Sequence, residues 1–146
     1  MSQHDQQSLQ VGVSGLGAMG MGTATVLLQH GFNVTGCDIS VDARDAFVAA
    51  GGKSVATPAE LAHCHIVLVV VVNGLQVEQV LFGEQGVAKR LRSGGVIISC
   101  ATVSPAFAAE MEAQAADMDL LYLDAPISGG AIKAAAGQLS IMAAGS

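Results

Sequence analysis

The stretch Val11-Gly-Val-Ser-Gly15-Leu-Gly17-Ala-Met-Gly20 joins a short apolar segment to three spaced glycines, G-x-G-x-x-G. Gly15 can make the tight turn that leaves a strand, Gly17 lets a pyrophosphate approach the bare backbone, and Gly20 lets a helix pack closely on the strand. The start of that helix then offers unpaired backbone N–H groups and a positive dipole end to phosphates. The stretch therefore predicts a dinucleotide-binding turn.

The segments after the glycines match this interpretation. Residues 23–29 continue as a helix that stops at His30-Gly31, and residues 32–37 form a second strand that Asp38 closes. An acid about 20 positions after the motif accepts hydrogen bonds from the adenosine ribose and repels a 2′-phosphate. The spacing predicts NAD rather than NADP. The alternative, a glycine-rich turn followed by a chance aspartate, is disfavoured because strand, turn, helix and acid occur in the required order.

Composition limits the classes of protein to consider. The chain has 146 residues, 51% of them hydrophobic, enough to bury the core of one domain and too few for two. Its longest apolar run, residues 66–72, is far shorter than the roughly 20 residues of a membrane span. The net charge of −6 comes without a basic cluster, which argues against nucleic acid or an anionic membrane as a partner. Residues 1–10 lack the features of a secretory signal, so we expect a disordered lead-in before one domain over residues 11–146.

The three cysteines, Cys37, Cys64 and Cys100, are an odd number without C-x-x-C spacing. This usage fits a reducing cytoplasm better than a disulfide framework. His63-Cys64-His65 offers metal-ligand side chains, but adjacent residues about to enter a strand point to opposite faces, and no second ligand pair follows. We therefore expect a cytoplasmic protein without a metal site.

The rest of the chain alternates between strand-like and helix-like segments. Strands are predicted at residues 54–56, 66–72, 95–99, 120–123 and 139–143, and helical pieces at residues 41–50, 57–63, 75–82, 87–91, 105–117 and 131–136, with a loop at residues 124–130. Thr57-Pro58 and Ser104-Pro105 are typical helix starts. The uninterrupted run at residues 66–72 indicates a central parallel strand covered by helices on both faces. The pattern predicts a doubly wound, mostly parallel α/β sheet of the Rossmann type, which binds ligands beyond the carboxyl ends of its strands.

Three segments in the same order resemble the β-hydroxyacid dehydrogenase family, which includes 3-hydroxyisobutyrate and 6-phosphogluconate dehydrogenases. They are Gly15 to Gly20, the turn Thr102-Val-Ser-Pro105, and Asp124-Ala-Pro-Ile-Ser-Gly-Gly130. Within the family, residues 72–77, 80–83 and 128–134 are most similar to the dehydrogenases of L-threonate. The resemblance covers nearly all of the chain after residue 10. It implies an oxidoreductase that oxidises a small hydroxy acid, similar to 3-hydroxyisobutyrate or L-threonate, by hydride transfer to NAD, and a full-length protein that is a homo-oligomer.

The resemblance also implies roles for the residues at matching positions. It assigns the pyrophosphate to Gly15, Leu16, Gly17, Ala18, Met19 and Gly20, the adenosine ribose to Asp38 and Ile39, the nicotinamide ribose to Val71, Val72 and Asn73, the nicotinamide to Thr102, and the substrate to Ser128, Gly129 and Gly130. Backbone N–H groups at Ser128-Gly129-Gly130 suit a carboxylate, the alternative being a hinge or simple turn. The chain departs from the family at Val71-Val72, where Leu-Pro is frequent. NADP-preferring relatives carry Asn-Arg at Asp38-Ile39.

No catalytic residue is expected within the chain. The family's catalytic lysine lies on a helix of a following all-helical domain, so we expect it beyond Ser146 and assign Lys133 to a solvated helix face. Asp124 is expected to be a structural hydrogen-bond acceptor. The chain is thus predicted to be the NAD-binding domain of a longer enzyme and to be inactive alone. The alternative is a free-standing NAD-binding or redox-sensing module without catalysis.

Overall fold

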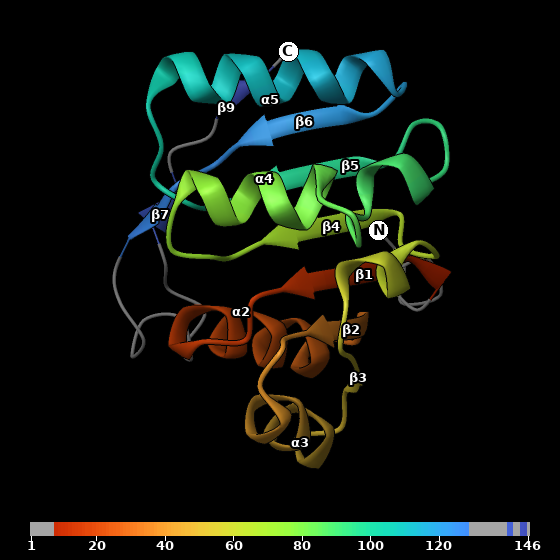
Figure 1. The fold of residues 1–146 in the computed structure, drawn as a ribbon. Helices are drawn as coiled ribbons and strands as arrows, with labels where there is room; N and C mark the ends of the chain where they lie inside the picture. Colours follow the sequence, from red (N-terminus) through yellow and green to blue (C-terminus); the bar gives the residue numbers. More distant parts are fainter. Residues whose placement is uncertain (1–7, 129–139, 142–143, 146) are drawn as a thin grey trace.

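The computed structural model describes residues 8–128, 140–141 and 144–145. Its main sheet has seven strands in the order β3-β2-β1-β4-β5-β6-β9 (Figure 1). In chain order these are β1 (Gln10–Ser14), β2 (Asn33–Cys37), β3 (Lys53–Val55), β4 (Ile66–Val69), β5 (Val96–Ser99), β6 (Leu121–Asp124) and β9 (Ala144–Gly145). The first six pair in parallel and β9 pairs antiparallel with β6. The predicted doubly wound, mostly parallel sheet is confirmed, with β4 at its centre.

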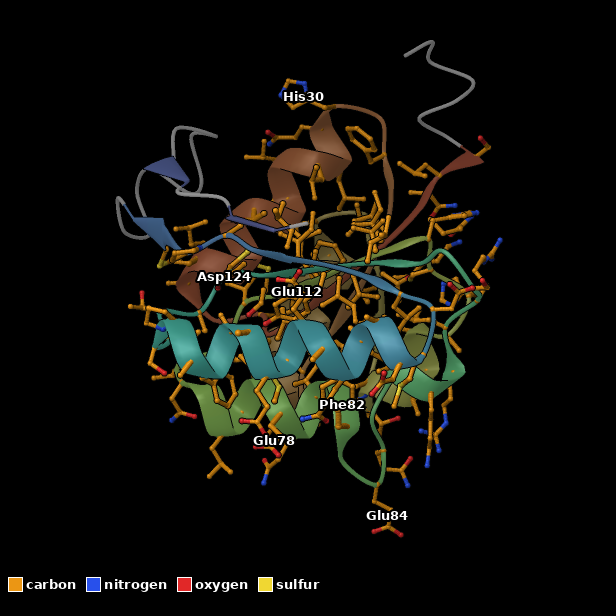
Figure 2. All side chains as sticks on the ribbon, turned by 90° about the horizontal axis from the view of Figure 1, so that it is seen from above. His30, Glu78, Phe82, Glu84, Glu112 and Asp124 are labelled. Atoms are coloured by element: carbon orange, nitrogen blue, oxygen red, sulfur yellow. The ribbon has the colours of Figure 1, made fainter. Side chains whose placement is uncertain are left out.

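Helices cover both faces of this sheet. The helical elements are α2 (Ala18–Gln29), α3 (Val41–Ala49), α4 (Gly74–Phe82), α5 (Pro105–Asp117) and the short 3-10 turns η1 (Pro58–Leu61) and η2 (Ala88–Arg90). Figure 2 shows α2 on one side of the sheet and α4 and α5 on the other. No helix in the described part of the chain is long and apolar enough to cross a membrane.

Strand β4 explains why its sequence shows no polar alternation. Val67 and Val69 belong to the core cluster that contains Leu81 of α4 and Met111 of α5. Leu68, between them, packs against the other cluster, which lies under α2 and α3. Successive side chains of a strand point to opposite faces, so a strand with a core on each face needs apolar residues at every position.

The same strand is shorter than predicted, since it ends at Val69 rather than at residue 72. Its neighbours β1 and β5 end at Ser14 and Ser99. The Val70 N–H still donates to the Ser14 carbonyl at 2.8 Å, but the Val72 N–H donates to a side chain instead. The apolar run continues past the point where partner strands exist, so its last residues form the wall of a cleft.

Other differences concern short segments. Residues 57–63 and 87–91 contain only the 3-10 turns η1 and η2, because segments this short seldom sustain α-helical hydrogen bonding. In the segment predicted as a loop, β7 (Ile127–Ser128) pairs with β8 (Ser140–Ile141) in a separate two-stranded sheet. Of the strand predicted at residues 139–143, the structure describes only residues 140–141, which form β8, and the strand at the edge of the main sheet is β9. The helical turn predicted at residues 131–136 lies outside the described residues.

Candidate functional site

A cleft of about 480 Å³ opens at the carboxyl ends of β1, β2 and β4. The order of the strands reverses between β1 and β4, and doubly wound sheets bind their ligands at such a switch point. Six predicted cofactor residues lie together in its lining: Gly15, Gly17, Asp38, Ile39, Val71 and Val72. The topology therefore brings the glycine turn, the acid after β2 and the segment after β4 to one place.

The three glycines of the turn have different structural reasons to be glycine. Gly15 has a φ of +103°, and a Cβ there would lie 2.0 Å from the Val70 carbonyl oxygen. A Cβ on Gly20 would lie 1.7 Å from the Gly15 carbonyl oxygen, so α2 packs against the turn itself. A Cβ on Gly17 would meet nothing within 4 Å. Gly17 is also the N-cap of α2 and provides no side-chain cap, which leaves the start of the helix open toward the cleft.

Asp38 ties the end of β2 to the glycine turn. Its Oδ2 accepts a hydrogen bond from the Leu16 N–H at 2.8 Å, and its Oδ1 accepts one from the Ser40 N–H at 2.8 Å. The Leu16 side chain is buried in the core, so this residue faces the carboxylate with its backbone alone. Each carboxylate oxygen has a second acceptor site. Asp38 is therefore fixed in place and can still accept a hydroxyl donor in the cleft.

The opposite wall of the cleft continues from the end of β4 into α4. The Val72 N–H donates to Oε1 of Gln76 at 2.8 Å, and the Gln76 N–H donates to Oδ1 of Asn73 at 3.0 Å. Asn73 is the N-cap of α4, and its side chain accepts a hydrogen bond from within that helix. It lies outside the lining of the cleft. Thr102, in the exposed turn after β5, also lies outside that lining.

The remaining predicted residues are placed only in part. Ala18 and Met19 form the first turn of α2. Ser128 ends β7, beyond the carboxyl end of β6, and Gly129, Gly130 and Lys133 lie outside the described residues. The substrate-binding role of Ser128, Gly129 and Gly130 and the surface position of Lys133 stay predictions.

Sequence reasoning missed the part of the cleft that α4 provides. Gln76, Gln79 and Val80 all line it, together with Pro58 at the start of η1. The three α4 residues have the spacing i, i+3 and i+4, which places them on one face of a helix. That spacing was visible in the sequence, but nothing in it shows that this face turns toward the glycine turn rather than toward solvent.

The cysteines are buried, and their burial disfavours the thiolate form. Cys37 lines the floor of the cleft, and burial raises the pKa of its thiol to about 11. Burial likewise raises the pKa values of Cys64 and Cys100 to about 11. The thiolate is the reactive form, so these residues are inert thiols at neutral pH.

The His63-Cys64-His65 segment has structural contacts. The Gln10 N–H donates to Nδ1 of His65 at 2.9 Å, and the Arg92 guanidinium donates to the His63 carbonyl at 3.0 Å. These bonds join the amino ends of β1 and β4 to the loop before β5. In the described part of the chain, no three His, Cys, Asp or Glu residues lie close enough to hold a metal ion.

Asp124, the last residue of β6, has an unusual environment. Among the described residues, its Oδ1 is buried without a hydrogen-bond partner, as are the Ser99 Oγ and the Tyr122 hydroxyl. The expected role of Asp124 as a structural acceptor stays a prediction. Burial raises the pKa of the Asp124 carboxyl and that of Tyr122.

Comparison with known proteins agrees with this geometry. A family model described as the NAD binding domain of 6-phosphogluconate dehydrogenase matches residues 10–146. The chain is 48% identical to an L-threonate dehydrogenase of Cupriavidus necator over 139 residues, which cover 94% of this chain and 47% of that protein. It is 31% identical to the human mitochondrial 3-hydroxyisobutyrate dehydrogenase over 136 residues, which cover 92% of this chain and 40% of that protein.

Solved structures share the fold. A 3-hydroxyisobutyrate dehydrogenase from Salmonella typhimurium superposes with a TM-score of 0.89 at 39% identity, over 93% of this chain and 48% of that one. Psf3, solved in complex with NADP+ and 2-OPP, superposes with a TM-score of 0.87 at 25% identity, over 93% of this chain and 49% of that one. The chain thus spans about half the length of the curated relatives it matches.

Proposed function

Since the chain belongs to the family of NAD-binding domains of 6-phosphogluconate dehydrogenase, we propose that it is the cofactor-binding part of a longer oxidoreductase. That enzyme oxidises a small hydroxy acid by hydride transfer to NAD. The observation that carries the proposal is the cleft at the switch point, where an open helix start and a fixed aspartate face one space. L-Threonate is the favoured substrate because the chain is 48% identical to an L-threonate dehydrogenase.

Different residues of the cleft suit different parts of the cofactor. The start of α2 at Gly17 suits the pyrophosphate, because backbone N–H groups and the helix dipole favour an anion. Asp38 would accept hydrogen bonds from the adenosine ribose hydroxyls, and Val71 and Val72 would line the other ribose. When bound, the nicotinamide supplies a carbon that accepts a hydride.

Oxidation of an alcohol also needs a base that takes the hydroxyl proton as the hydride leaves. Among the described residues, the lining of the cleft contains no histidine or lysine, and the hydroxyls of Thr102 and Ser104 are too weakly basic for this task. We therefore propose that the base, a lysine by resemblance, is supplied by another part of the whole protein. The 146-residue chain alone should then bind cofactor without turning over substrate.

Cofactor choice is tested by calorimetric titration of the chain with NAD and with NADP. A 2′-phosphate would lie beside the Asp38 carboxylate, so we expect NAD to bind at least about tenfold more tightly. Asp38→Asn should lower the ratio of the affinity for NAD to the affinity for NADP. Asp42→Asn, which removes the same charge from the exposed first turn of α3, should leave it unchanged. Equal affinities in the unchanged chain would remove Asp38 from this role.

Activity is tested by mixing the chain with NAD and L-threonate, 3-hydroxyisobutyrate or glycerate and following NADH absorbance. We expect none, and we expect turnover from a protein extended through the next domain. Turnover by the chain alone that is lost in Lys133→Met would contradict the proposal. An extended protein that binds NAD but oxidises none of these acids would favour the NAD-binding or sensing module instead.

Three further properties of the whole protein belong to this proposal. The domain begins at about residue 11, the protein is cytoplasmic, and it assembles as a homo-oligomer. The cytoplasmic assignment rests on Cys37, Cys64 and Cys100, which are free and buried, as suits a reducing compartment. Light scattering on the extended protein measures the assembly.

A further inference from the structure

Gln76 makes a hydrogen bond that ordinary helix capping does not require. It is the third residue of α4, counted from the N-cap Asn73, and its own N–H is capped by Asn73. In a capping box, the side chain at this position reaches back to the N–H of the N-cap residue. Here it reaches one residue further, to the N–H of Val72, at 2.8 Å. Val72 lines the cleft, so the bond fixes the wall as well as the helix.

This bond also orients the Gln76 amide. A backbone N–H needs an acceptor, and in a glutamine side chain only Oε1 can accept, because Nε2 carries two donors. Oε1 therefore faces Val72, and Nε2 is the donor end of a side chain that lines the cleft. The side chain presents donors, beside Val72, to whatever occupies that part of the cleft.

We propose that Gln76 positions and binds the nicotinamide half of the cofactor: Oε1 holds the Val71-Val72 wall, and Nε2 donates to the hydroxyl oxygens of the nicotinamide ribose. The inference rests on the proposed function, which assigns Val71 and Val72 to that ribose. The opposite end of the cleft has its own residue for the other ribose, Asp38, which lies after β2. Gln76, bonded to Val72, lies on the wall that continues from β4.

Two substitutions separate this role from simple helix capping. Gln76→Glu keeps an acceptor oxygen, and glutamate is as suitable as glutamine at the third position of a helix. The substitution removes both Nε2 donors. Gln76→Leu removes acceptor and donors together. Gln79→Glu is the matched control, because it adds the same charge to the same wall one turn further along α4.

The ligands are NAD, ADP-ribose and ADP, titrated calorimetrically into the chain and each variant. ADP-ribose contains the second ribose without nicotinamide, and ADP ends at the pyrophosphate. Relative to Gln79→Glu, we expect Gln76→Glu to bind NAD and ADP-ribose about three- to tenfold more weakly, the effect of one lost hydrogen bond, and ADP equally well. Its melting temperature should equal that of the unchanged chain.

Proline at position 72 provides a rescue that isolates the acceptor. Val72→Pro removes the backbone N–H that donates to Gln76 Oε1. In the double variant Val72→Pro/Gln76→Leu, position 72 therefore has no N–H that lacks an acceptor. We expect it to regain the melting temperature lost in Gln76→Leu, while its affinity for ADP-ribose stays low because the Nε2 donors are still missing. A double variant that regains ADP-ribose affinity would contradict the donor role.

The inference is overturned if Gln76→Glu binds all three ligands like the control, or if ADP loses as much affinity as ADP-ribose. An unchanged chain that binds none of the three ligands would instead overturn the proposed function, and the inference with it. If the unchanged chain binds ADP and the Gln76 variants bind ADP-ribose with unaltered affinity, the proposed function is retained. Gln76 then has no part in cofactor binding.

Discussion

At the scale of the residue, the glycine motif combines two different requirements. Gly20 must be glycine for the fold, because any Cβ would overlap the Gly15 carbonyl. Gly17 has open space around the position of its Cβ, so the fold tolerates a side chain there. The fold therefore does not require glycine at position 17, and the proposed approach of a pyrophosphate to the start of α2 supplies a reason for it. The two positions can therefore be separated experimentally.

We predict that Gly20→Ala destabilises the chain by about 3 kcal/mol or more, since backbone atoms rather than a flexible side chain obstruct the Cβ. Gly17→Ala should change stability by at most about 1 kcal/mol, the difference between glycine and alanine at an N-cap. It should nevertheless bind NAD at least about tenfold more weakly. Urea unfolding and calorimetry measure the two effects. A stable Gly20→Ala would mean that the turn and α2 can separate without loss.

The site was predictable from the sequence where one residue type has few uses. A glycine triplet followed by an acid indicates a dinucleotide, and Gly15, Gly17 and Asp38 do lie in one cleft. Gln76 was not predictable, because glutamine is an ordinary residue of exposed helices. Its contact with Val72 depends on where β4 ends. Strand β4 ends where its neighbours β1 and β5 end.

At the scale of the element, helix starts with a distinct cap were predicted to the residue. Ser104 accepts the Phe107 N–H at 3.1 Å, and α5 runs from Pro105 to Asp117 as expected. Short elements without their own pattern were not predicted. The two-residue strands β7 and β8 exist through their pairing with each other, and two residues carry no periodicity.

The Ser104 cap gives a prediction at this scale. Ser104→Ala removes the oxygen that accepts the Phe107 N–H and should lower the free energy of unfolding by about 1 kcal/mol, the usual value of such a cap. Thr102→Ala, in the exposed turn just before it, should change stability by less than about 0.5 kcal/mol. Both are measured by urea unfolding. Equal effects of the two substitutions would show that α5 is held by its packing alone.

At the scale of the whole molecule, the sheet separates two hydrophobic cores. One cluster packs under α4 and α5, the other under α2 and α3, and β4 contributes to both. This architecture followed from the sequence because alternating strands and helices with an unbroken apolar strand have few other solutions. The buried polar atoms of Ser99, Tyr122 and Asp124 did not follow from it, because burial on one face of β5 and β6 depends on how α5 packs.

Asp124 makes the stability of the whole molecule depend on pH in a defined direction. Burial raises the pKa of its carboxyl above the ordinary value of 3.8, so the folded chain holds this proton more tightly than the unfolded chain. Stability contributed by the protonated form is present at low pH and is lost as pH rises through the raised pKa. Asp124→Asn cannot ionise, so its free energy of unfolding should increase relative to that of the unchanged chain between about pH 4 and pH 7. The side chain is partly exposed, so only the direction is predicted.

Urea unfolding at a series of pH values measures this difference, with Asp117→Asn as the matched control at the exposed end of α5. Any constant offset between Asn and Asp at position 124 cancels, because the prediction concerns the change with pH. A difference that stays constant with pH would show that folding does not change the pKa of Asp124. A difference that falls as pH rises would show that the Asp124 carboxylate is stabilised in the folded chain. It would then have a donor in solution, and the carboxyl would act as the structural acceptor that the sequence predicted.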